Sequence, residues 1–164
     1  MIPKSPRPAQ AENAVETLPE RVREIVGART GRDAKLVATV KAVKAAAPRY
    51  TWVGIYLLEG KELVLHNFIG RPTPHTRIPV AEGICGAAVR ENSTLVVDDV
   101  NADPRYLACS IETKSEIVVP IRDASGKPIG ELDLDSDAKA AFDARDREAL
   151  ERVADLLGPV VAGG

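Results

Sequence analysis

The sequence lacks the features that would place the protein outside the cell, in a membrane or on nucleic acid. Its 164 residues include only two cysteines, Cys85 and Cys109, too few for a disulfide framework. No apolar run is long enough to span a bilayer, and the N-terminal segment lacks the apolar core of a secretory signal. The net charge is −2 and no block of basic residues occurs, so no nucleic-acid or membrane partner is indicated. We therefore expect a cytoplasmic protein.

What is present is typical of one globular domain. Hydrophobic residues make up 45% of the sequence and charged residues 28%, values that are ordinary for soluble proteins. The length suits a single domain with a sizeable core. Residues 1–15 contain several prolines and few large apolar side chains, so we expect them to form a flexible tail. Residues 16–162 are predicted to form the domain.

Helical patterns occur near both ends of that domain. Apolar residues recur at helical spacing in residues 17–26 and 33–47. Thr17 and Glu20 have the spacing of a capping box at the start of the first helix. An amphipathic helix is predicted near the C-terminus, and Asp143 can cap it.

The middle of the chain alternates apolar and polar residues with period two, which indicates strands. A hairpin that turns near Gly60 is followed by further strands and by one short helix at 82–92. The predicted hairpin and strands cover residues 51–68, 76–80, 94–100, 115–121 and 129–135. These elements predict an α+β fold, a central antiparallel sheet flanked by N- and C-terminal helices.

The last predicted strand, "GELDLDSD" at residues 130–137, carries an unusual row of acids. Glu131, Asp133 and Asp135 share one face, because successive side chains of a strand point to opposite sides. A solvated sheet face would explain this pattern. Stacked like charges are nevertheless unfavourable, so a binding role for the acids is the alternative.

The register of the preceding strand adds one more acid to this row. A four-residue loop at 124–127 is a common hairpin length, and it would pair Val118 with Asp133 and Glu116 with Asp135. This register also turns the apolar residues of both strands to the opposite face, as a core requires. We therefore predict that Glu116, Asp133 and Asp135 face the same way.

Two aromatic residues share a strand face in "TWVGIYLL". Trp52, Gly54 and Tyr56 alternate with the apolar residues that are predicted to face the core. A glycine inside a strand often leaves room for another group to approach. Aromatic walls and clustered carboxylates would suit a small cation, such as an alkylammonium or the α-amino group of an amino acid. Cross-strand aromatic packing under a loop is the alternative.

Both cysteines lie in contexts that allow chemistry. Cys85 lies in "GICG" at the start of the short helix, where the helix dipole would favour a thiolate. Cys109 lies in a long connection a few residues before Glu116. Inert buried thiols are the alternative, and a lone pair of cysteines is more often of that kind.

Taken together, five segments resemble the free methionine-(R)-sulfoxide reductases, a family built on a single GAF domain. The resemblance runs from about Tyr50 to the C-terminal helix. The segments are "YTWVGIYLLEGKELVL", "RIPVAEGICGAAV", "DDVNADPRYLACS", "SEIVVPI" and "GELDLDS". Any one of them occurs in many GAF domains, whereas their combination in this order is specific.

This resemblance implies a role for each candidate residue. Cys109 would be the nucleophile and Cys85 a cysteine that forms a disulfide with it. The residues expected to bind substrate are Trp52, Tyr56, Glu116, Asp133 and Asp135. The family usually has a third cysteine just before the "RIP" strand, where this chain has His75. His75 is either a tolerated loop substitution or a hydrogen-bond partner of a thiol or of the sulfoxide oxygen.

The implied activity is reduction of free methionine-(R)-sulfoxide through a cysteine sulfenic acid and an intramolecular disulfide, with thioredoxin as the reductant. We expect no metal and no cofactor, and a homodimer is possible. Two other functions stay open. One is a non-catalytic GAF sensor for an amino acid or amine, and the other is a former reductase that now only binds.

Overall fold

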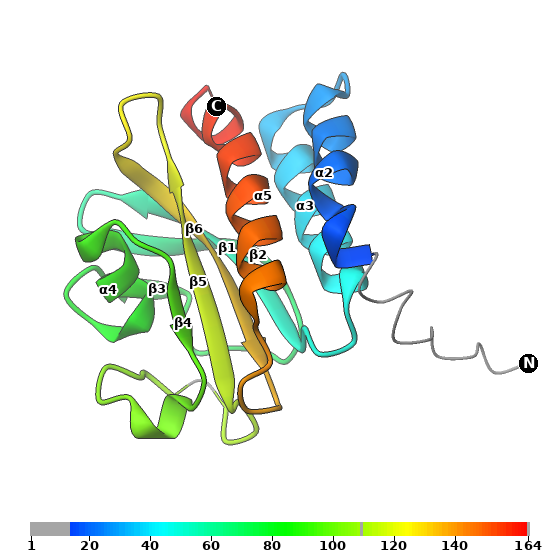
Figure 1. Cartoon of the computed structure of the whole chain (residues 1–164). Coiled ribbons are helices and arrows are strands. Elements are labelled where there is room, and N and C mark those ends of the chain that lie inside the picture. Colours follow the sequence, from blue (N-terminus) through cyan, green and yellow to red (C-terminus); the bar gives the residue numbers. More distant parts are fainter. Residues whose placement is uncertain (1–13, 109, 164) are drawn as a thin grey trace, which may run out of the picture.

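The computed structural model describes residues 14–108 and 110–163. Its centre is a six-stranded antiparallel sheet with the strand order β3-β2-β1-β6-β5-β4 (Figure 1). The strands are β1 (Trp52–Glu59), β2 (Glu62–Ile69), β3 (Arg77–Pro79), β4 (Leu95–Val97), β5 (Ser115–Arg122) and β6 (Pro128–Ser136). The sheet therefore joins the two predicted hairpins through β1 and β6 at its centre.

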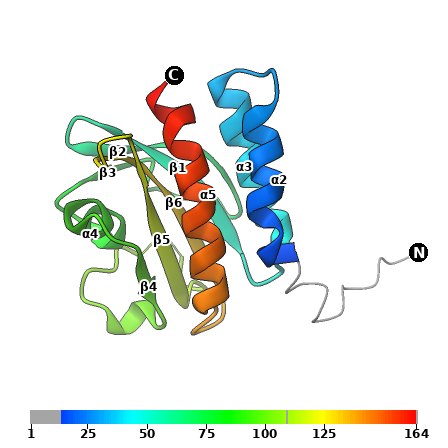
Figure 2. The same cartoon turned by 45° about the horizontal axis from the view of Figure 1, so that its top comes forward.

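Helices cover both faces of this sheet. Three long helices lie side by side on one face, and a shorter helix lies on the other, as Figures 1 and 2 show. The helices are α2 (Leu18–Gly27), α3 (Arg32–Ala46), α4 (Gly83–Glu91) and α5 (Ala144–Ala162), with one 3-10 turn at Val100–Ala102. The predicted α+β class, with terminal helices flanking the sheet, is confirmed.

Each face of the sheet has its own apolar cluster. On the α2, α3 and α5 side, alternate residues of β1, β5 and β6 pack under the helices, among them Ile55, Ile117 and Leu134, which are fully buried. The cluster on the α4 side is smaller and contains Trp52 and Tyr56. Period-two alternation thus divides these strands between a large core and a second face that carries the polar candidates.

The predicted register of β5 and β6 is confirmed along most of their length. Val118 pairs with Asp133, and Glu116 pairs with Asp135. The pairing shifts by one residue after Ile121, so Arg122 rather than Asp123 lies opposite Pro128. The irregularity lies next to the turn and leaves the acid row unchanged.

Of the two predicted helix caps, the one at the start of α5 is confirmed and the one at the start of α2 is not. Asp143 caps α5 in a capping box with Asp146, as the sequence predicted for Asp143. The predicted capping box of Thr17 and Glu20 is wrong, because the residues just before Thr17 are already helical and its hydroxyl donates back to Ala14 O.

The structure bears on two further expectations, the N-terminal tail and the lack of a membrane-spanning segment. Of the tail predicted for residues 1–15, only Ala14 and Val15 are described, and Val15 is buried in the larger core. Among the described helices, none combines the length and apolar character that crossing a membrane would need.

Candidate active site

The acid row and the aromatic residues lie on the same face of the sheet, beneath α4. Because β1 pairs with β6, Trp52 lies opposite Asp135 and Tyr56 lies opposite Glu131. Asp133 lies opposite Gly54, between the two aromatic residues. The alternative of a solvated acid face is therefore wrong, since all four acids are buried. They are Glu116, Glu131, Asp133 and Asp135.

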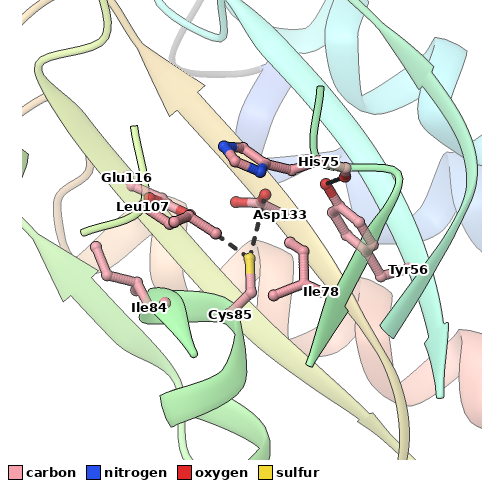
Figure 3. A pocket seen from close by; sticks show the side chains of 9 residues that line it. Tyr56, His75, Ile78, Ile84, Cys85, Leu107, Glu116 and Asp133 are labelled. Carbon is pink, nitrogen blue, oxygen red and sulfur yellow. Dashed lines mark hydrogen bonds between the residues drawn. The ribbon is translucent and has the colours of Figure 1, made fainter. Parts of the chain in front are cut away.

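Cys85 approaches this face from the first turn of α4. Its Sγ lies 3.4 Å from Asp133 Oδ2 and 3.8 Å from Glu116 Oε1, and the thiol can donate to either carboxylate (Figure 3). Burial raises the pKa of Cys85 well above its ordinary value, and the charges of Asp133, Glu131 and Glu116 raise it further. The expected helix-dipole thiolate is thus wrong: burial, together with three carboxyls, outweighs the dipole, and the resting thiol is protonated.

Burial also changes the protonation of the acids themselves. It raises the pKa of Asp133 to about 6. It raises the pKa of Glu131 well above the ordinary glutamate value, and the Asp133 charge adds to this effect. Burial, followed by the charges of Asp133 and Asp137, likewise raises the pKa of Asp135, which Arg71 partly offsets. The row can therefore keep carboxyl protons at neutral pH and donate them.

The space left by the missing side chain of Gly54 is filled by the ring of Trp52, two residues earlier in the same strand. A Cβ at position 54 would overlap the ring of Trp52, so the indole lies flat across the glycine. Trp52 also stacks on Phe68, with ring centroids 5.5 Å apart, and its Nε1 donates to Arg71 O at 3.1 Å. Aromatic packing, the alternative drawn from the sequence, accounts for Gly54, and the indole forms a fixed wall.

Tyr56 and His75 connect the sheet to the loops above it. The Tyr56 hydroxyl donates to His75 O at 2.7 Å, and His75 Nε2 lies 2.9 Å from Ala108 O. The imidazole also lines the cavity over Cys85, as Figure 3 shows. The contact of the imidazole with a backbone carbonyl favours neither interpretation of His75, a tolerated substitution or a hydrogen-bond partner of a thiol or of the sulfoxide oxygen. Its partner, Ala108, directly precedes Cys109.

The predicted site residues line two small neighbouring cavities. Tyr56, Cys85, Glu116 and Asp133 share the first, of about 20 Å³. Trp52 and Asp135 lie in the second, of about 10 Å³, together with Arg71, Ser110 and Thr113. Each cavity has room for roughly one water molecule. An amino acid needs more space than either cavity holds in this structure.

One predicted residue lies outside the described part of the chain, and two described residues extend the prediction. Cys109, the expected nucleophile, falls in the gap between residues 108 and 110. Glu131 was recognised on the acid face but was not assigned to the site, although it lies opposite Tyr56 and contributes to the raised pKa of Cys85. Arg71 was not predicted at all, because no sequence pattern places it beside Asp135.

This arrangement can bind a cation and move protons. Buried carboxylates beside aromatic rings stabilise an ammonium group, and carboxyls with raised pKa values can act as acids near neutral pH. A thiol in contact with two carboxyls can lose its proton to one of them. The described residues of this face therefore combine a reactive sulfur with proton donors and acceptors.

Comparison with known proteins agrees with this chemistry. The chain matches the GAF domain family over residues 33–161. It is 40% identical over 119 residues to the free methionine-R-sulfoxide reductase of Saccharomyces cerevisiae, an overlap that covers 71% of this chain and 66% of the yeast protein.

Two solved structures extend the comparison to the fold. The type II free methionine-R-sulfoxide reductase from Thermoplasma acidophilum is 41% identical, with a TM-score of 0.76 over 89% of this chain and 96% of that one. The free methionine-R-sulfoxide reductase from Neisseria meningitidis, solved with its substrate, is 35% identical, with a TM-score of 0.86 over 99% and 95%. The chain thus belongs to the GAF domain family and, within it, to the free methionine-R-sulfoxide reductases.

Proposed function

We propose that the protein reduces free methionine-(R)-sulfoxide to methionine on the acid face of its sheet. The observation that carries this proposal is the contact of the Cys85 thiol with Asp133 and Glu116 in one buried cavity. Relatives named as reductases of this substrate, at 35–41% identity, support the same assignment.

The carboxylates provide the recognition of a free amino acid. Glu116, Asp133 and Asp135 would bind the α-ammonium group and hydrogen-bond the sulfoxide oxygen, and Trp52 and Tyr56 would wall the apolar part of the side chain. In a peptide the same nitrogen is an uncharged amide, so a site of this kind selects the free amino acid.

The first chemical step transfers the sulfoxide oxygen to a cysteine. The Cys109 thiolate attacks the sulfoxide sulfur while a protonated carboxyl of the acid row gives its proton to the oxygen. The sulfoxide is reduced to the methionine thioether, which leaves, and Cys109 is oxidised to a sulfenic acid.

The second step involves Cys85. Asp133 accepts the Cys85 proton, for which its raised pKa of about 6 and the 3.4 Å contact suit it. The thiolate then forms a disulfide with the sulfenic acid, and water leaves. A dithiol reductant of the thioredoxin type returns both cysteines to thiols. This cycle needs a reducing compartment, which makes the cytoplasm our proposed location.

A single-turnover experiment tests the roles of the two cysteines. Reduced protein is mixed with one equivalent of free methionine-(R)-sulfoxide, methionine is measured, and the cysteines are identified by mass spectrometry. We expect Cys109→Ser to form no methionine. Cys85→Ser should form one equivalent, keep a sulfenic acid on Cys109, and fail to turn over with thioredoxin.

Other outcomes of this experiment overturn parts of the scheme. Methionine formation by Cys109→Ser but not by Cys85→Ser would reverse the two roles. Full turnover with thioredoxin in both variants would remove both thiols from the mechanism. Tight binding of the sulfoxide by the wild-type protein without methionine would favour the non-catalytic sensor.

A further inference from the structure

We propose that Cys85, Glu116 and Asp133 form a Zn²⁺ site, through which the metal reversibly blocks this pocket. The three side chains come from α4, β5 and β6, so the fold and not a local sequence motif brings them together (Figure 3). One ligand atom of each lies within 4.8 Å of the other two. No sequence pattern indicates such a site, because the spacing of the three residues matches no metal motif.

The distances suit a tetrahedral ion. With Zn–S near 2.3 Å and Zn–O near 2.0–2.2 Å, tetrahedral geometry separates sulfur from oxygen by roughly 3.5–3.7 Å. Cys85 Sγ lies 3.4 Å from Asp133 Oδ2 and 3.8 Å from Glu116 Oε1. Both sulfur–oxygen distances thus lie within a few tenths of an ångström of those that a tetrahedral ion requires.

Buried acceptors without donors supply a second, independent indication. Asp133 Oδ1 is buried, and so are both carboxylate oxygens of Glu131; among the described residues these three atoms have no hydrogen-bond partner. Asp133 also lines the cavity over Cys85. Buried carboxylates are costly unless a donor or a cation compensates them, and a divalent ion bound through the Asp133 carboxylate would place positive charge beside these oxygens.

The donor set selects the metal. A thiolate with two carboxylates suits the borderline-soft Zn²⁺, whereas Mg²⁺ requires six oxygen ligands in octahedral geometry. Three protein ligands leave one position open, and here that position faces the cavity that His75 also lines. Water or the imidazole can complete the coordination.

Inhibition follows from the overlap with the reductase site, and this part of the inference rests on the proposed function. The ion would take the carboxylates proposed to hold the ammonium group and the sulfur proposed to close the disulfide. Zn²⁺ should therefore compete with free methionine sulfoxide, and a chelator should restore activity.

Co²⁺ serves as the spectroscopic probe, because a thiolate ligand gives it a near-ultraviolet charge-transfer band. Reduced protein is titrated with Co²⁺ under a phosphine reductant, which binds the metal weakly, and Zn²⁺ is then added in competition. We expect a band at one equivalent that Zn²⁺ removes and Mg²⁺ does not. In Cys109→Ser, Cys85 is the sole thiol, and this variant should bind Co²⁺ within about twofold of wild type.

Replacement of a ligand should weaken binding strongly. Cys85→Ser should lose the band, and Glu116→Gln and Asp133→Asn should weaken Co²⁺ binding by at least about tenfold. Glu62→Gln is the matched control, because this exposed acid lies on β2, outside the pocket, and it should bind as wild type does. Circular dichroism checks that each variant is folded.

The possible results separate the metal site from the reductase. A band that survives Cys85→Ser, or that disappears in Cys109→Ser, overturns the site. A Cys85-dependent band in a protein that forms no methionine keeps the site and rejects the proposed function. Methionine formation that Zn²⁺ leaves unchanged, despite a Cys85-dependent band, overturns the inhibition.

Discussion

Two buried carboxylates on opposite sides of the sheet differ in how they are satisfied. On the α5 side, Asp146 accepts hydrogen bonds from the Arg49 guanidinium, the Tyr50 hydroxyl and the backbone N–H of Asp143. On the α4 side, Glu131 is equally buried, and neither of its carboxylate oxygens has a partner among the described residues.

This difference separates residues that stabilise the fold from residues kept for chemistry. The Asp146 carboxylate, with its three donors, holds the segment just before β1 to the start of α5. An unsatisfied one costs free energy, and such costs are tolerated where a ligand or a proton supplies the missing partner. The face under α2, α3 and α5 therefore carries the stability of the domain, and the acid face under α4 carries its reactivity.

Leu134→Ala should have the largest effect on stability. Leu134 is fully buried in the core under the helices, between two acids that point the other way. Its truncation should lower the free energy of unfolding by about 2–5 kcal/mol. Denaturant unfolding measures this value. The specific activity of the protein that remains folded should change little; an equally large loss of activity would mean that the two faces are not separable.

A matched pair of substitutions compares the two buried carboxylates directly. Asp146→Asn weakens charge-assisted hydrogen bonds and should cost about 1–3 kcal/mol of stability. Glu131→Gln removes a carboxyl that has no partner, so stability should hold or rise. Thermal melts of both variants at neutral pH test this contrast, and destabilisation of similar size in both would contradict it.

Changes on the acid face should affect catalysis instead. Glu116→Ala and Asp135→Ala should each reduce kcat/KM for free methionine sulfoxide by about 1–3 kcal/mol in transition-state terms. Stability should hold or rise, because like charges on neighbouring strands are removed. A sharp drop in the melting temperature with unchanged kinetics would make these acids structural.

The pH dependence of stability should show a smaller effect of Asp133. Its folded pKa of about 6 lies above the ordinary value of 3.8, so the folded state keeps a proton that the unfolded state has lost. Its contribution to stability is present below pH 3.8 and is lost as the pH rises through about 6. The melting temperature of Asp133→Asn relative to wild type should therefore increase over this range. A constant difference would contradict the shift.

Local pattern was sufficient to predict the acid face. Because alternation has period two and the core face must stay apolar, the pairing of Glu116 with Asp135 was predicted correctly. The predicted loop length was wrong, since five residues connect Arg122 to Pro128, and the irregularity after Ile121 compensates for the extra residue. The same reasoning put Trp52 and Tyr56 on a common face, which the structure confirms.

The remaining features depend on contacts that no local pattern encodes. The thiol of Cys85 is protonated because it is buried and α4 places it beside acids from β5 and β6. Its position at the start of α4 had instead suggested a thiolate. The position of the Trp52 ring over Gly54 follows from side-chain packing in the folded structure. The contact of His75 with Ala108 O depends on how a loop distant in sequence folds.

The most direct test of the account is the conversion of the separate epimers of methionine sulfoxide. The wild-type protein is incubated with dithiothreitol and either the free (R) epimer, the free (S) epimer or a peptide that contains the (R)-sulfoxide, and product formation is followed by chromatography. We predict methionine from the free (R) epimer and little product from the other two. Comparable rates on the peptide would reject the ammonium-binding role of the acid face, and the absence of product from every substrate would reject the reductase itself.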